Sequence, residues 1–505
     1  MKSFVRIVVC CCLVVSLSVS AAPAGADHRS TEPQAMDLLF ESPNDGGFTN
    51  SDLAFWGDLA FAGNYGGFRI FDVSDPADPS LVADVECFGP QGDVTVWDRD
   101  GDGAVDILFV SVDTVLTGPE CGATAAEDIR DPDGWEGIRI FDVRDPANPT
   151  QIGSVYQHCG SHTHTLVPRR AREHRVLLYN SSYPLRPGPT CGQPAEGEEA
   201  HHDRDPLHGV IQVVEVSWDA DDPLDADGLT AETIAEPPID YPDDPDNAFV
   251  PDEHGLAGFD PLRACHDIGV HTGVKLAAGA CGEQLQLWKI GRDGIPDTAD
   301  PLWVFDDSVD DNGATGDPGD HEVAVDFWHT ARFTWDGRYV QGDDESFGDG
   351  CPPVSTIGLD ASEPNSDTGR THLVRTSTGQ RVSTFMIPRP EADAYCSMHQ
   401  GNFIPTPGRY LSVNAWYDGG VDIIDFTSVR RPREIAFFDH PTTDGAAGSN
   451  NWAHYWYETD PRRRRPVTTY GQDLARGFQV FSTTLRGVRR FGVHHLNPQT
   501  QERVF

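Results

Sequence analysis

The stretch GGFRIFDVSDPADP (Gly66–Pro79) returns seventy residues later as EGIRIFDVRDPANP (Glu136–Pro149). Each copy is a short run of β-branched and aromatic residues between a glycine and a proline, which is typical of a strand between two turns. The Asp-Pro-x-x-Pro ending predicts a rigid turn, because proline fixes φ and has no N–H for a strand ladder. The chain therefore repeats one strand-and-turn unit, and such a period decides the architecture.

Weaker copies of the same unit occur further along the chain. The third is GVDIIDF (Gly420–Phe426), and fainter echoes occupy His208–Ser217, Glu283–Ile290 and Ala475–Ser482. Upstream of the copies, segments such as His329–Asp344 and His399–Trp416 read as a strand, an Asp-Gly or Pro-Gly turn, and a second strand. Four antiparallel strands per unit are the blade of a β-propeller. The expected inner strands start at Asp52, Asp93, His162, His266, His329, His399 and His454, so the sequence predicts an all-β, seven-bladed β-propeller.

The repeated phrase, Gly-(apolar)-x-Ile-(apolar)-Asp-(apolar)-x-Asp-Pro-x-x-Pro, resembles the LVIVD repeat of secreted bacterial β-propellers. The copies beginning at Gly67 and Gly137 match it closely, the copy at Gly420 matches in part, and the echoes match in outline. The resemblance implies a propeller fold and export from the cell, and it implies no particular reaction.

The two ends of the chain have distinct expected roles. Residues 1–26 read as a signal peptide, with Lys2 and Arg6 before an apolar run and Ala24-Gly25-Ala26 at the cleavage site. Residues 27–45 form an N-terminal segment in which Asp37–Ser42 is expected to be a closing strand beside Gly477–Ser482, because the last blade lacks an outer strand of its own. The propeller is expected over residues 46–487, and residues 488–505 are expected to be a C-terminal tail whose last dozen residues can be removed at little cost.

Charge and cysteine content limit the partners and the cellular compartment that can be expected for the protein. The chain has 80 acidic and 37 basic residues and a net charge of −43, which disfavours nucleic acid and anionic membranes as partners. No apolar run after residue 26 approaches the roughly 20 residues of a membrane helix, so the protein is not expected to be embedded in a membrane. Three of the eleven cysteines belong to the signal peptide, and the remaining eight suit an oxidising compartment. Neighbours in sequence are expected to pair, as Cys87–Cys121, Cys159–Cys191, Cys265–Cys281 and Cys351–Cys396.

Histidines recur at the expected inner-strand starts. Five of the seven positions carry one, and a sixth histidine shares a strand face with the first; the set is His162, His164, His266, His329, His399 and His454. Inner strands surround the central channel of a propeller, so these imidazoles are candidates for a copper, iron or zinc site. The alternative is that each histidine hydrogen-bonds a backbone carbonyl of the neighbouring blade.

An acidic loop, DRDGDGAVD (Asp98–Asp106), is a candidate calcium site. Asp98, Asp100, Asp102 and Asp106 occupy positions 1, 3, 5 and 9 of a calcium loop, with Gly103 at position 6. Position 12 is Phe109 in place of the bidentate glutamate, so the loop is not a complete EF-hand. The alternative is a plain acidic hairpin turn.

Two classes of function remain open. The sequence has no G-x-S-x-G, P-loop or H-E-x-x-H motif. The first hypothesis is a secreted binding or interaction scaffold at or outside the cell surface, a monomer with an extracellular protein, glycan or small molecule as partner. The second is a metal-dependent oxidoreductase that uses the histidines around the channel. Whether the protein catalyses a reaction is left open by the sequence.

Overall fold

The computed structural model describes residues 36–127, 131, 133–170, 173–182, 209–219, 224, 228–239, 265–282, 284–306, 325, 327–346, 351, 369–389, 394–441, 448–460, 466–485, 488 and 490–502. The strands of these residues are numbered β1 to β30, and no helix among the same residues is long and apolar enough to cross a membrane. The predicted signal peptide lies outside the described residues and stays a prediction.

The strands of the described residues form six sheets, and five of these contain one four-stranded antiparallel meander. The first two are β2 (Asn50–Trp56), β3 (Leu59–Asn64), β4 (Gly67–Asp72) and β5 (Ser80–Glu86), then β6 (Gln91–Trp97), β7 (Ile107–Leu116), β8 (Trp135–Asp142) and β9 (Thr150–Tyr156). The third and fourth are β10 (Thr163–Val167), β11 (Arg175–Ser181), β12 (Gln212–Trp218) and β13 (Leu229–Ala235), then β14 (Asp267–His271), β15 (Leu276–Cys281), β16 (Gln284–Lys289) and β17 (Trp303–Asp306). The fifth is β18 (Trp328–Phe333), β19 (Tyr339–Asp344), β20 (Thr371–Arg375) and β21 (Arg381–Phe385).

The remaining sheet has eight strands and consists of two antiparallel groups. One is β22 (Gln400–Ile404), β23 (Leu411–Ala415), β24 (Val421–Asp425) and β25 (Arg433–Phe438). The other is β26 (Asn451–Trp456), β27 (Val467–Asp473), β28 (Gly477–Thr483) and β1 (Met36–Ser42). Only a two-residue parallel pairing between β22 and β26 joins the two groups.

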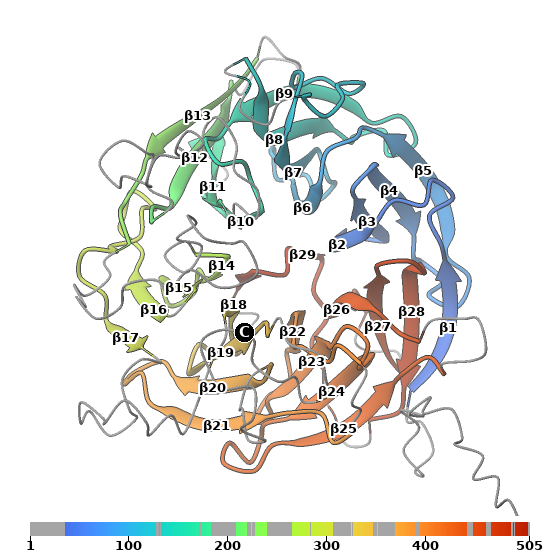
Figure 1. Ribbon diagram of the computed structural model, residues 1–505, viewed down its shortest axis with the longest axis vertical. Coiled ribbons are helices and arrows are strands. Elements are labelled where there is room, and N and C mark those ends of the chain that lie inside the picture. The colour runs from blue at the N-terminus through green and yellow to red at the C-terminus, as the bar shows by residue number, and fades with distance from the viewer. Residues whose placement is uncertain are drawn as a thin grey trace, which may run out of the picture.

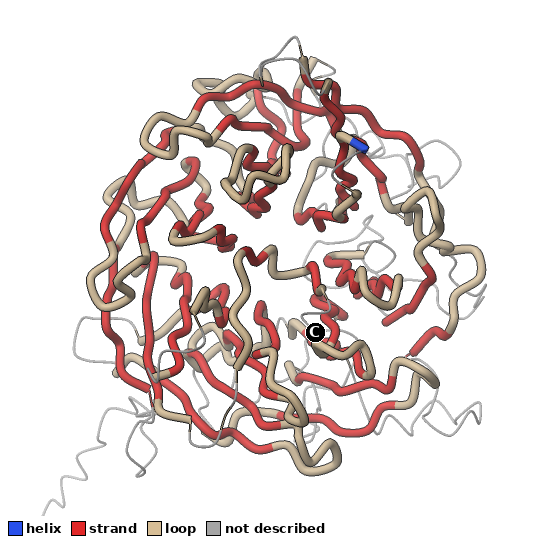
Figure 2. The backbone as a smooth tube through the Cα atoms, turned by 180° about the vertical axis from the view of Figure 1, so that it is seen from behind, coloured by secondary structure: helices blue, strands red, loops and turns tan. Residues whose placement is uncertain are grey.

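The groups are arranged as a propeller-like ring (Figure 1). The first strand of each group lies nearest the centre and the last lies at the rim, and the view from behind shows the same closed circle (Figure 2). Apolar side chains fill the space between neighbouring groups; one such cluster contains Ala54, Phe61 and Phe68 from the β2–β5 sheet with Val94, Leu108 and Phe141 from the β6–β9 sheet. The all-β, propeller-like character predicted from the repeat is therefore present.

The repeated phrase forms the third strand of its sheet, as β4 and β8, and its residues serve the architecture. Gly67 has a φ of 143°, and a Cβ at this position would lie 2.0 Å from the Val85 carbonyl oxygen, so only glycine fits where β5 passes. The guanidinium of Arg139, in the same phrase, donates hydrogen bonds to the carbonyls of Cys87 (3.0 Å) and Phe88 (2.8 Å), directly after β5. The arginine thus fastens one sheet to the end of the preceding outer strand.

The N-terminal strand completes the last group, as the sequence predicts. β1 pairs antiparallel with β28 from Met36 opposite Thr483 to Ser42 opposite Phe478. The guanidinium of Arg69, the counterpart of Arg139, donates to the carbonyls of Ser42 and Pro43 at 3.0 Å each. The first sheet is therefore tied directly to the closing strand of the last group.

The C-terminal segment differs from the expected dispensable tail. Two short strands, β29 (His495–Leu496) and β30 (Thr500–Gln501), pair with β2 and β14 respectively, and Figure 1 shows β29 near the centre of the ring. Between them, the Asn497 side chain accepts from the Val96 N–H (2.8 Å) and donates to the Val96 carbonyl (2.9 Å). The sequence does not reveal these contacts, because each strand has only two residues and the Asn497 side chain makes the hydrogen bonds that a strand backbone would otherwise make.

Three of the four expected disulfides are present: Cys87–Cys121, Cys265–Cys281 and Cys351–Cys396. The fourth expected pair, Cys159–Cys191, remains a prediction because Cys191 lies outside the described residues. Disulfides of this kind are compatible with an extracellular setting.

Candidate metal centre

One residue from each four-stranded group lies in a common layer just where the first strand of the group begins. A common hydrogen bond identifies this layer: His266 Nδ1 donates to the His329 carbonyl (3.1 Å) and His399 Nδ1 to the Trp452 carbonyl (2.6 Å). Ser51 Oγ makes the same bond to the Gly92 carbonyl (2.8 Å). By these bonds and the strand register, the layer consists of Ser51, Gly92, His162, His266, His329, His399 and Trp452.

The layer differs from the one expected from sequence at three places. Asp52 and Asp93 are displaced by one residue from Ser51 and Gly92, and His454 by two residues from Trp452. The pairing register shifts near the start of β2, β6 and β26, as it also does in β18, and a count along the sequence does not reveal such shifts. With Trp452 in place, an apolar residue, Trp456, again follows four positions later.

Four of the six predicted histidines lie side by side in this layer. The ring centroids of His162 and His266 are 4.5 Å apart, those of His266 and His329 3.7 Å, and those of His329 and His399 4.2 Å. All four are buried, with between 0% and 4% of their surface exposed. We call them the histidine layer.

The other two predicted histidines, His164 and His454, do not belong to the histidine layer. His164 uses both ring nitrogens within the protein, bonding Thr95 through Nε2 (2.8 Å) and Ser111 through Nδ1 (2.7 Å). His454 does the same, with the Asn414 carbonyl at 3.0 Å and Thr469 at 2.7 Å. Both rings therefore lack a lone pair directed at the other histidines.

Within the histidine layer, His162 also has both nitrogens engaged. Its Nδ1 lies 2.6 Å from an Asp113 carboxylate oxygen, and its Nε2 is 3.2 Å from the Gln91 amide nitrogen. His266, His329 and His399 instead use Nδ1 for a bond to the protein, to the His329 carbonyl, Thr330 Oγ1 and the Trp452 carbonyl. His266 and His399 donate to carbonyls through Nδ1, so their lone pair is on Nε2, whereas the Thr330 hydroxyl can donate to or accept from His329 Nδ1.

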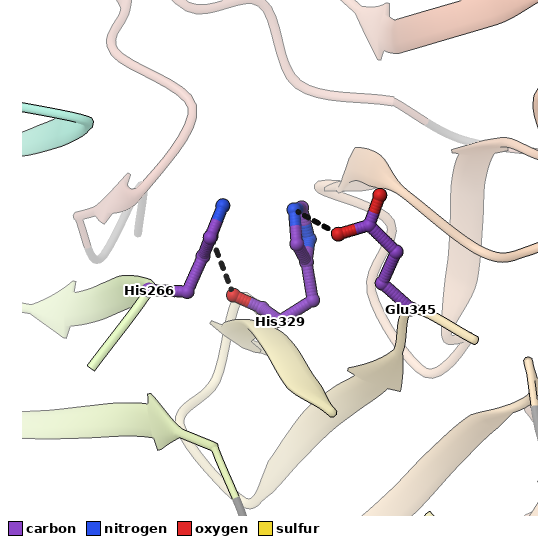
Figure 3. Close-up of side chains that lie close together, drawn as sticks. All are labelled: His266, His329 and Glu345. Carbon is purple, nitrogen blue, oxygen red and sulfur yellow. Dashed lines mark hydrogen bonds and ion pairs between the residues drawn. The ribbon is translucent and has the colours of Figure 1, made fainter. Parts of the chain in front are cut away.

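Glu345, which the sequence analysis missed, supplies a carboxylate to the same point. Its Oε2 lies 3.3 Å from His329 Nε2 and its Oε1 lies 4.0 Å from His399 Nε2. Ligand atoms of His266, His329 and Glu345 lie within 4.8 Å of one another (Figure 3). Glu345 directly follows β19 and belongs to no motif, so only the pairing of β18 with β19 brings it beside His329.

Burial sets the charge of these groups. It lowers the pKa of His266 and His329 well below the usual value and that of His399 to about 3, so the three imidazoles are neutral at pH 7. Burial also raises the pKa of Glu345 to about 7, although the Tyr417 hydroxyl donates to its Oε1 at 2.6 Å. Neutral imidazoles beside a carboxylate are a donor set for a cation.

The Asp98–Asp106 loop brings three of its four predicted ligands together. Oxygens of Asp98, Asp100 and Asp106 lie within 4.8 Å of one another, whereas Asp102 Oδ1 accepts from the Ala104 N–H at 2.7 Å. Burial, with the charges of Asp100 and Asp98, raises the pKa of Asp106 to about 6. A cation would relieve this repulsion, so calcium at the loop stays a prediction with a suitable geometry.

If the loop binds calcium, millimolar calcium should raise the melting temperature of the protein, and Asp100→Ala should reduce the rise. A ligand at a hundredfold excess over Kd stabilises the native state by about 2.7 kcal/mol. Differential scanning fluorimetry with and without a chelator measures the effect, and Asp78→Ala, at an exposed acidic turn outside the loop, is the control. Equal melting temperatures for wild type in calcium and in chelator would leave the loop a plain turn.

Comparison with known proteins supports the repeat. Residues 49–86 match the model of the LVIVD repeat. No curated protein matches the sequence. A solved structure described as "Crystal Structure of Mitotic Checkpoint Complex" aligns with 95% of this chain and 99% of its own chain, at 12% identity and a TM-score of 0.43. The chain thus contains, at residues 49–86, an LVIVD repeat, a repeat family found in β-propeller proteins.

Proposed function

We propose that the protein is an exported seven-bladed β-propeller that binds a transition metal at the centre of its ring through His266, His329, His399 and Glu345. The blade count rests on counting the two groups of the eight-stranded sheet separately, which gives seven first strands around the centre. Export is supported by the sequence of residues 1–26 and is compatible with the disulfides.

The observation that carries the metal proposal is the pair formed by His329 Nε2 and Glu345 Oε2. His329 Nε2 is buried, has no hydrogen-bond partner among the described residues, and lies 3.3 Å from the carboxylate oxygen. An imidazole nitrogen and a carboxylate oxygen at this distance require a proton or a cation between them. Bonding to a backbone carbonyl explains the Nδ1 contacts of His266 and His399, but it does not explain why the Nε2 side of His329 faces a carboxylate.

The surroundings suit a metal ligand set. Metal-bound histidines usually donate their other N–H to a carbonyl or carboxylate, as His266 and His399 do. Imidazoles with one carboxylate suit iron, copper or zinc. A bound iron or copper would supply one-electron chemistry, which is the oxidoreductase hypothesis. The chain's own residues hold the ligands: Tyr417 orients Glu345, and the carbonyls of the next blade orient the imidazoles.

The interaction scaffold is the second candidate function. A propeller-like repeat fold is consistent with such a scaffold, and the net charge of −43 favours basic partners. This reading needs no metal, so metal content separates the two candidates.

The test is the metal content of protein produced without a histidine tag. We expect about one equivalent of copper, iron or zinc in wild type, and a loss of affinity on the order of 100-fold in His329→Ala and Glu345→Gln, since removing an outer partner alone costs 10–100-fold. His454→Gln is the matched control, because that buried histidine has both nitrogens bonded to protein and should leave the metal content unchanged. Wild type that neither contains nor takes up any of these metals would leave the scaffold as the function.

A further inference from the structure

A second polar site lies one residue deeper along the first strands than the histidine layer. Asp52 and Asp93 follow Ser51 and Gly92 there, with 3% and 2% of their surface exposed. They line a cavity of about 10 Å³, which is room for one water molecule or one monatomic ion. We call Asp52 and Asp93 the carboxylate pair.

The hydrogen bonds of Asp52 are those of an ionised carboxylate. Its Oδ1 accepts from the Tyr455 hydroxyl (2.5 Å) and the Leu53 N–H (2.7 Å), and its Oδ2 accepts from the Gln499 amide (3.2 Å). Three donors on one carboxyl group favour the charged form. Burial and the charge of Asp93 act in the opposite direction and raise the pKa of Asp52 well above its usual value.

Asp93 presents an oxygen that the protein does not satisfy. Its Oδ2 accepts from the His164 N–H at 2.7 Å and lies 3.1 Å from His164 Nδ1. Its Oδ1 is buried, and no donor group among the described residues reaches it. The Asp52 and Asp93 carboxyl groups lie close enough to hydrogen-bond through one proton, which helps to raise the pKa of Asp52 and to lower that of Asp93. An unpaired carboxylate oxygen in the interior is costly, and beside a second carboxylate it is costlier still.

The rest of the cavity wall offers more oxygen. Besides the carboxylate pair, it is lined by four residues with hydroxyl or amide groups, Ser51, Gln91, Thr163 and Gln400, and by His266, His399 and Trp452. The Gln400 amide nitrogen donates to Asp267 Oδ2 at 3.2 Å, which leaves its amide oxygen as an acceptor. Oxygen ligands with two carboxylates are the preference of a hard divalent cation.

We infer that the carboxylate pair and the oxygen atoms around it bind one calcium ion at the centre of the ring, beside the histidine layer, whose His266 and His399 line the same cavity. The two negative charges balance the ion, and Asp93 Oδ1 gains the partner that the protein lacks. This site also differs from the Asp98–Asp106 loop, which is a surface hairpin whose Asp100 is exposed and whose Asp106 is buried.

The experiment uses the full mature chain with the loop disabled by Asp98→Ala and Asp100→Ala. After chelation and dialysis against calcium chloride, mass spectrometry should find one equivalent of calcium per chain. Adding Asp93→Asn, which removes a charge and keeps the shape, should remove that equivalent. Asp439→Asn is the control, because Asp439 is a buried carboxyl far along the sequence from the cavity-lining aspartates.

Terbium chloride gives a second readout that does not depend on the folding of Asp93→Asn. Trp452 lines the cavity, so terbium bound there should emit when tryptophan is excited, and Trp452→Phe should reduce that emission at unchanged binding stoichiometry. The inference is wrong if the loop-disabled chain retains no calcium. It is also wrong if Asp93→Asn leaves the calcium content unchanged and Trp452→Phe leaves the terbium emission unchanged. A carboxylic acid band in the infrared spectrum at saturating calcium would show that the pair shares a proton instead. Transition-metal content, measured before chelation, tests the histidine layer.

Discussion

Deletion of Met36–Pro43 should destabilise the protein by about 5 kcal/mol or more. The deletion removes β1 and leaves β28 as an exposed edge, which is a site of aggregation. Met36 is buried (1% exposed) and Phe40 packs on the cluster around Phe478, so their burial alone contributes about 1.5–3 kcal/mol each.

The same deletion deprives Arg69 of its partners. Its guanidinium is buried and donates to the carbonyls of Ser42 and Pro43, and burial lowers its pKa. A buried cation that loses its acceptors costs about 1–3 kcal/mol or more. Denaturant unfolding followed by tryptophan fluorescence measures the effect, and a chain that lacks only residues 27–35 is the control. Equal transition midpoints for the two chains would show that the ring closes without β1.

Much of the fold could be predicted because each copy of the repeat carries the residues that form its own strand and turn. The glycine, the alternating apolar residues and the Asp-Pro turn of Gly66–Pro79 each act within a few residues, and β4, its turn and β5 follow from them. The closing strand could also be predicted, since Asp37–Ser42 has an outer-strand pattern and the last group needs one. These features depend on short-range chemistry that a sequence displays.

The candidate site could be predicted only in part. The histidines at four first-strand starts were visible, but the register shifts that put Trp452 in the layer in place of His454 were not, because an inserted residue leaves no compositional mark. Glu345 was missed for a different reason: its place beside His329 depends on which residue of β19 faces β18. The two short C-terminal strands depend on partners more than two hundred residues away.

Deletion of residues 490–505 should destabilise the protein at least as much as loss of β1, contrary to what the sequence alone suggests. The segment touches the first strands of four consecutive sheets: β29 pairs with β2, Asn497 bonds Val96 in β6, Thr500 Oγ1 donates to the Leu166 carbonyl in β10, and β30 pairs with β14. It also stacks the His495 ring on Trp56 at 4.6 Å. A segment that bonds four sheets resists their separation, so its removal should weaken the ring as a whole.

Asn497→Ala isolates the strongest single contact in that segment. The substitution leaves the buried N–H and carbonyl of Val96 without partners, and each unsatisfied group costs about 1–3 kcal/mol, so we expect a loss of about 2–5 kcal/mol. Asn497→Asp keeps the acceptor for the N–H but repels the carbonyl, and its stability should lie between those of wild type and Asn497→Ala. Urea unfolding measures all three, with removal of residues 503–505 as the control truncation. If the 490–505 deletion and Asn497→Ala both unfold at the wild-type midpoint, the ring is held by β1 and its sheets alone. If Asn497→Ala loses the stability expected for two hydrogen bonds, a single polar side chain links the C-terminal segment to β6 as the backbone pairing of a strand would.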